Sequence, residues 1–214
     1  MSTEIPTAAR PVLVWMSGNR GRLAELVSEE IGADGDASPE ADGSIRAHLR
    51  FVAEGLGATA GSDEPGLGAY AASVDTALDP DRFAEYAAAT GEAHAFVATS
   101  QFGDDAGDDP VNREVIDRRV RIDAWIRLFL DTLDEARSPA EPWAPGVNAW
   151  MHKEQDRLAN TIFAMDRRAK QVEIDRGNQQ AIDDPETSNL IGRAAVIQAH
   201  MRFLVEAIGT VRAA

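Results

Sequence analysis

The chain has 214 residues, no cysteine and a formal net charge of −15, and 44% of its residues are hydrophobic. The missing cysteines exclude disulfides and thiolate metal sites, and the hydrophobic content is enough for a sizeable core, which argues against disorder throughout. No apolar run approaches the roughly 18–20 residues of a membrane-spanning helix, and residues 12–16 are too short a run for a secretory signal core. We therefore expect a non-secreted protein without a membrane segment, located in the cytoplasm or inside a virion or other particle.

The charge is unevenly distributed along the chain. Residues 32–109 hold 16 acidic side chains against three arginines, a net charge of −13, whereas residues 110–214 hold 16 acidic and 15 basic side chains, a net charge of −1. Many carboxylates with only two lysines are typical of proteins adapted to high salt, although a GC-rich genome also favours arginine. We expect the middle to face solvent. The balanced C-terminal half suits either docking or ion pairs within long helices.

Residues 1–109 are predicted to form short helices joined by Gly- and Asp-rich linkers. The apolar run at residues 12–16 fits either a short buried strand or a buried turn of helix, because it is too short for its periodicity to distinguish them. Asp79 and Pro80 are a helix start, and Gly91 is expected to end that helix. Residues 92–102 fit helix or strand equally. The apolar faces of the predicted helices are Leu23, Leu26, Val27 and Ile31; Ile45, Leu49, Val52 and Leu56; Tyr70, Val74 and Leu78; and Phe83, Tyr86 and Ala87.

Three long helices are predicted in residues 110–214. The first begins at Asp109–Pro110 and is expected to end near Arg137, and prolines at 139, 142 and 145 make the connector after it stiff. The second is expected over residues 147–176, and the third begins at Asp184–Pro185. Apolar residues recur along the third helix four and three apart, at Leu190, Ala194, Ile197, Met201, Leu204, Ile208 and Val211.

These elements predict an all-α protein with two parts. Residues 110–214 are expected to form an antiparallel bundle of three long helices, and residues 1–109 a smaller acidic helical region, with a short strand at residues 12–16 as the alternative to helix there. The apolar seam of the last helix fits packing within one chain or between copies. Tryptophans flanking the proline connector either cover the bundle end or anchor a partner. The candidate interface residues are therefore Trp143, Trp150, Leu190, Ile197, Met201, Leu204 and Ile208.

Residues 16–22 have the outline of an anion-binding loop before a helix. Ser17, Asn19, Arg20 and Arg22 are the candidate ligand-binding residues, because free N–H groups and arginines attract anions at such a turn. The segment lacks the Gly-Lys-Ser/Thr ending of a P-loop and the three glycines of a dinucleotide site. A plain turn is the alternative interpretation.

Metal and nucleic-acid chemistry have weaker support. Asp104, Asp105, Asp108 and Asp109 could bind a divalent cation, but their spacing does not match an EF-hand, and a solvated acidic loop is the alternative. None of the four histidines has a glutamate three residues before it, and no zinc motif is present, so no cofactor is expected. The basic clusters at residues 118–121 and 167–170 are interleaved with acids, so nucleic-acid binding is not expected.

We interpret the sequence as a non-enzymatic structural or assembly protein. Its partners would be copies of itself, as a homo-oligomer, and other protein subunits of a larger particle, of which an adaptor-like virion component is one form. Two alternatives remain open. One is an enzyme or binding protein with an anionic ligand at residues 17–22, and the other is an acidic decoy that inhibits a nucleic-acid-binding protein through residues 32–109.

Overall fold

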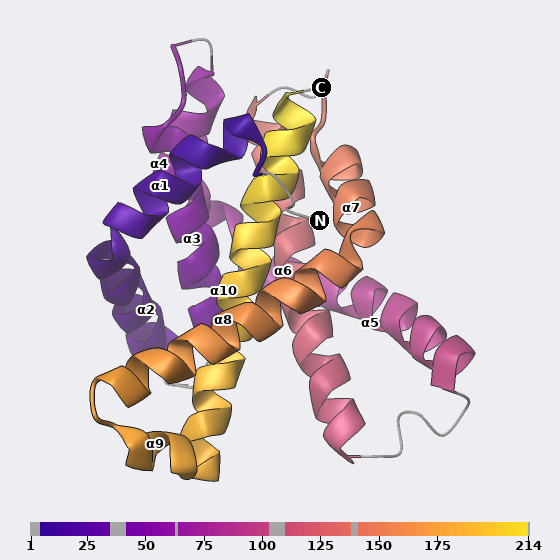
Figure 1. Cartoon of the computed structure of the whole chain (residues 1–214). Helices are drawn as coiled ribbons and strands as arrows, with labels where there is room; N and C mark the ends of the chain where they lie inside the picture. Colours follow the sequence, from indigo (N-terminus) through magenta and orange to yellow (C-terminus); the bar gives the residue numbers. More distant parts are fainter. Residues whose placement is uncertain (1–4, 35–41, 63, 103–109, 138–140, 214) are drawn as a thin grey trace.

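The computed structural model describes residues 5–34, 42–62, 64–102, 110–137 and 141–213, which form helices joined by short connections (Figure 1). The predicted all-α class is confirmed, since the described residues contain no strand. A short 3₁₀ helix, η1, precedes the α-helices. In chain order the elements are η1 (Thr7–Ala9), α1 (Arg10–Gly18), α2 (Arg20–Asp34), α3 (Asp42–Ala58), α4 (Pro65–Ala77), α5 (Pro80–Phe102), α6 (Pro110–Arg137), α7 (Ala144–Lys153), α8 (Gln155–Asp175), α9 (Gln179–Asp183) and α10 (Pro185–Arg212).

The alternative of a short strand at residues 12–16 is wrong, because these residues lie within α1. Pro11 stands in the first turn of this helix, where its missing N–H costs nothing. Val12 is buried, and the Trp15 ring packs against Phe51 of α3 with centroids 5.1 Å apart. A strand here would have no neighbouring strand to accept its backbone hydrogen bonds, so helix is the conformation that satisfies them.

Two predicted helix ends are also wrong. Helix α5 continues through Gly91 to Phe102, because alanines and glutamates around the glycine favour helix and one glycine costs only about 1 kcal/mol. The helix expected over residues 147–176 is instead broken at Glu154, which separates α7 from α8. Packing explains the break: Trp150 near the end of α7 lies against Phe203 of α10, with ring centroids 4.8 Å apart, and α8 then follows α10 in a new direction.

The core is centred where α3, α4 and α6 meet the C-terminal half of α10. Trp125 and Phe129 of α6, Tyr70 of α4 and Leu204 of α10 all belong to the main cluster of buried side chains. The Tyr70 hydroxyl donates a hydrogen bond to the carbonyl oxygen of Phe129, at 3.1 Å. This cluster therefore takes residues from both sides of the predicted division at residues 109 and 110.

The long helices do not form a simple three-helix bundle. Helix α10 packs against α8, α7, α3 and η1, whereas α6 packs mainly against α5, α4 and α3. The close approach of η1 to α10 depends on Gly209, because a Cβ atom there would lie 2.6 Å from the backbone nitrogen of Ala9. The N-terminal half of α10, with α8 and α9, extends away from this core as a helical hairpin (Figure 1).

Candidate protein-interaction face

The outer face of α8 presents a large apolar side chain to solvent. Leu158, Ile162 and Met165 fix the helix by packing toward Ala199 and Phe203 of α10. Residues spaced four and seven apart share one side of a helix, so Phe163, Arg167 and Ile174 lie together on the side away from α10. Phe163 is 68% exposed and Ile174 37% exposed. We call these three residues the α8 face.

Two of the basic residues on the outer side of α8 have no acidic partner within the described ranges, whereas Lys170 pairs with Asp166. Arg167 and Arg168 are exposed, and neither forms an ion pair with another residue of the described ranges. The other predicted basic cluster differs, since Arg118 pairs with Glu114 and Arg121 with Asp42. Over Gln155–Asp175 four acidic and four basic side chains balance, so α8 is a neutral helix on a chain with net charge −15.

Most of the predicted interface residues are buried in the core of the same chain. Ile197, Met201, Leu204 and Ile208 are all 1% exposed or less, so the seam of α10 packs within one molecule from Ile197 onward. Leu190, at the start of the seam, is 42% exposed on the projecting hairpin. Of these five seam residues, Leu190 is the one with a surface open to a partner.

The tryptophans around the proline connector lie under arginines. Trp143 is buried, with the Arg137 guanidinium carbon 3.1 Å from its ring centroid. Trp150 is partly buried between Phe203 and the Arg157 guanidinium. Both side chains therefore fit the interpretation that they cover the end of the helical bundle. Trp143 packs at the start of α7 and Trp150 near its end. Sequence reasoning missed Phe163, although its position opposite Leu158 and Ile162 on the predicted helix was the available signal.

The predicted anion site lies in the short turn between α1 and α2. Ser17 Oγ donates to the carbonyl oxygen of Leu13, and Asn19 Nδ2 donates to that of Trp15, so both side chains are hydrogen-bonded to carbonyl groups of α1.

The two arginines of the predicted anion site differ in their surroundings. Arg20 is exposed. Arg22 donates to Glu54 at 2.9 Å, and this hydrogen bond raises the pKa of its guanidinium above the ordinary value. An anion would have to compete with that carboxylate, and the site stays a prediction.

The predicted metal site at Asp104, Asp105, Asp108 and Asp109 lies outside the described residues. Within the ranges that the structure describes, no group of three or more His, Asp or Glu side chains is arranged to hold a metal ion.

A histidine–aspartate cluster that sequence reasoning missed joins α5, α6 and α10. His94 Nε2 lies 2.9 Å from Asp123 Oδ2. His200 is buried, and its Nδ1–H donates to the carbonyl oxygen of Val196 at 2.7 Å, while its Nε2 has no hydrogen-bond partner among the described residues. Burial lowers the pKa of His200, although the charge of Asp123 opposes the shift and that of Arg119 adds to it. The neutral imidazole is therefore the form that this fold holds.

Stability should fall as the pH decreases below about 6.5, the pKa of an unfolded histidine. The folded pKa of His200 is lowered, so the unfolded chain binds the proton more readily and protonation favours unfolding, by about 1 kcal/mol per pH unit for each such group. His48, whose pKa is also lowered by burial, adds to the slope. Burial alone would raise the pKa of Asp123, but the His94 hydrogen bond and the nearby His200 and Arg119 lower it, so its contribution is lost only at more acidic pH.

This pH dependence can be measured by urea unfolding between pH 7.5 and 5.5. Between pH 7.5 and 5.5, the free energy of unfolding of His200→Phe should decrease clearly less than that of the wild type. His152→Phe, at an exposed position, should retain the full loss. Equal slopes for wild type and His200→Phe would contradict the assignment.

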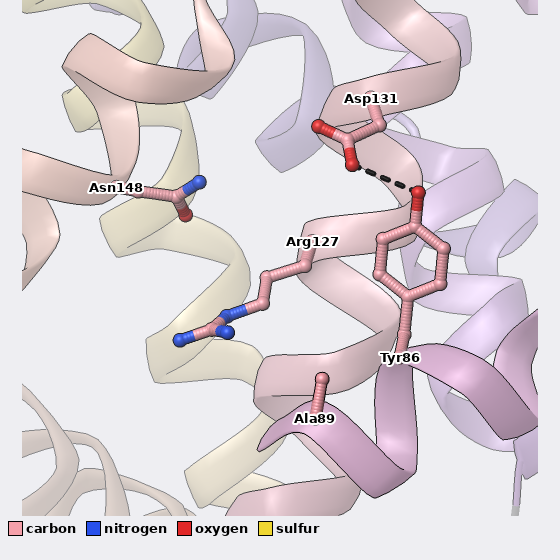
Figure 2. A pocket seen from close by; sticks show the side chains of 5 residues that line it. All are labelled: Tyr86, Ala89, Arg127, Asp131 and Asn148. Carbon is pink, nitrogen blue, oxygen red and sulfur yellow. Dashed lines mark hydrogen bonds between the residues drawn. The ribbon is translucent and has the colours of Figure 1, made fainter. Parts of the chain in front are cut away.

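A pocket of about 330 Å³ lies between α5, α6 and α7 (Figure 2). The Tyr86 hydroxyl donates to Asp131 at 2.8 Å, and burial together with this hydrogen bond raises the pKa of Tyr86 to about 12. Arg127 and Asn148 line the other side. The one guanidinium and the one carboxylate in this lining offset each other, so the pocket shows no electrostatic preference for an anionic ligand.

Comparisons of the chain with protein families, with curated proteins and with solved structures find no match. Among the described helices, none combines the length and the apolar character that crossing a membrane requires.

Proposed function

We propose that this chain is a non-enzymatic structural subunit that assembles with copies of itself through the α8 face, as a homo-oligomer or within a larger particle such as a virion. The observation that carries the proposal is Phe163, 68% exposed at the centre of an outward helix face and followed one turn later by Arg167. Burying a phenylalanine side chain stabilises a complex by about 2 kcal/mol. Aromatic side chains and arginine are also the residue types that dominate binding energy in interfaces.

The distribution of charge supports this location for the contact. Two chains of net charge −15 repel each other, and contact between acidic surfaces would oppose association. Helix α8 has no net charge, so an approach through it meets less repulsion than an approach through the acidic residues 32–109. Leu190, on the same projecting hairpin, adds apolar surface that a partner could cover.

Size-exclusion chromatography with light scattering tests the proposal. The wild type should show a mass that is a multiple of 23.0 kDa and rises with protein concentration, and Phe163→Asp should shift it toward the monomer. Val14→Asp is the matched control, because Val14 of α1 is 66% exposed and the substitution adds the same charge. This control should assemble like the wild type, and circular dichroism should show unchanged helix content in both variants.

A wild-type chain that stays at 23.0 kDa over the whole concentration range would overturn the proposal. Equal effects of Phe163→Asp and Val14→Asp would also overturn it, since the loss of assembly would then follow from added charge and not from the α8 face.

A further inference from the structure

Helix α5 carries an outward face of carboxylates and alanines, whose charge is opposite to that of Arg167 on the α8 face. Asp81, Glu85 and Glu92 are exposed, and none of them forms an ion pair with another described residue. They share one side of the helix with the exposed Ala84 and Ala88, because residues spaced three, four and seven apart lie together. We call these five residues the α5 face.

The inner side of α5 is occupied, so the α5 face is the side that remains available. Phe83 stacks on Trp125 of α6 with ring centroids 4.3 Å apart, and Thr90 is fully buried. The hydroxyl of Tyr86 is bound to Asp131. These contacts fix the rotation of α5 about its axis and direct the carboxylates to solvent.

The spacing of the two faces matches. Phe163 and Arg167 are four residues apart, which is about 6 Å along a helix, and the same spacing separates Ala88 from Glu92. Alanine leaves room above the helix surface for an aromatic ring. With Phe163 seated on Ala88, Arg167 therefore lies beside Glu92 or, in the opposite helix orientation, near Glu85.

We propose that the α5 face of one copy receives the α8 face of the next; this inference rests on the proposed self-assembly. Both faces are exposed in the same chain, so neither is covered by the other within one molecule. In Figure 1, α5 extends toward the right of the view and the C-terminal half of α8 toward the left. A contact between two different faces is heterologous, so copies join head to tail and form a closed ring or an open filament.

Charge reversal separates this contact from others. Arg167→Glu/Arg168→Glu makes both faces negative, and Glu85→Arg/Glu92→Arg makes both faces positive. Each variant alone should therefore associate at least about tenfold more weakly than the wild type. A mixture of the two should restore assembly, because each reversed face then finds an oppositely charged partner face. Asp117→Arg/Asp183→Arg is the control for the change in net charge, at exposed positions elsewhere, and should assemble on its own.

The outcomes distinguish this contact from the broader proposal. If Phe163→Asp disrupts assembly while Glu85→Arg/Glu92→Arg assembles like the wild type, the α8 face binds something other than α5. The present inference then fails and the proposed function stands. Failure of the mixture to restore assembly, with both variants folded by circular dichroism, would also overturn the inference. A monomeric wild type would overturn both proposals.

Discussion

Glu30→Ala should lower the free energy of unfolding by about 3 kcal/mol, because the variant loses a carboxylate that two partly buried guanidinium groups share. The Glu30 side chain of α2 is 11% exposed and contacts Arg46 at 2.6 Å and also Arg50, both on α3. The Arg46 guanidinium in turn lies over the Trp125 ring of α6, 5.7 Å from its centroid. The carboxylate therefore holds α2 against α3, and Arg46 in turn connects α3 to α6.

Urea unfolding of Glu30→Ala and Glu29→Ala provides a matched comparison of neighbouring residues. Glu29 also contacts arginines, at 3.5 Å from both Arg22 and Arg50, but its side chain is 52% exposed. Solvent screens such a pair, so Glu29→Ala should cost less than about 1 kcal/mol. Similar losses in the two variants would show that burial does not determine the contribution of Glu30.

Asp134→Ala should destabilise the chain by about 3 kcal/mol, because the buried carboxylate of Asp134 on α6 caps the start of another helix, α7. The two carboxylate oxygens accept the backbone N–H groups of Trp143 and Ala144, each at 2.7 Å, at the start of α7. No side chain at the N-cap of α7 makes such a bond. Without Asp134, two buried donors lose their acceptor, and the end of α6 loses two hydrogen bonds to the start of α7.

Asp184→Ala is the control for a cap exposed to solvent. The Asp184 side chain accepts the backbone N–H of Thr187 at 2.9 Å at the start of α10, in solvent, so its loss should cost clearly less than the loss of Asp134. Asp134→Asn retains one acceptor oxygen and should fall between wild type and Asp134→Ala in urea unfolding. A loss for Asp134→Ala no larger than that for Asp184→Ala would contradict the role of the buried cap.

Local signals in the sequence predicted where several helices begin and end. Helices α5, α6 and α10 start at Pro80, Pro110 and Pro185, and α8 is followed by Gly177 with a φ of 83°. Capping and proline geometry act within one turn of the chain, so they can be recognised without knowing the fold. The four-and-three spacing of α10 predicted its buried side for the same reason, and Ile197, Met201, Leu204 and Ile208 are buried.

The candidate interaction site could be predicted only in part. The uneven charge left two alternatives for the C-terminal half, a docking surface or ion pairs within long helices, and it indicated a solvent-facing acidic region before it. Leu190 was named from the seam and is exposed, whereas Phe163 was not recognised. Its exposure depends on which side of α8 meets α10, and that is decided by Leu158 and Met165 packing near Phe203, about forty residues later in the chain.

The sequence by itself determined the helical class, the starts of α5, α6 and α10 and the distribution of charge, because each follows from neighbouring residues or from composition. Tertiary contacts decided that residues 12–16 are helix, that α7 ends at Lys153, and that Asp134 caps α7. They also brought His94 to Asp123, 29 residues apart. Such pairings depend on the direction in which each helix leaves its connector, and the periodicity of apolar residues along one helix carries no information about that direction.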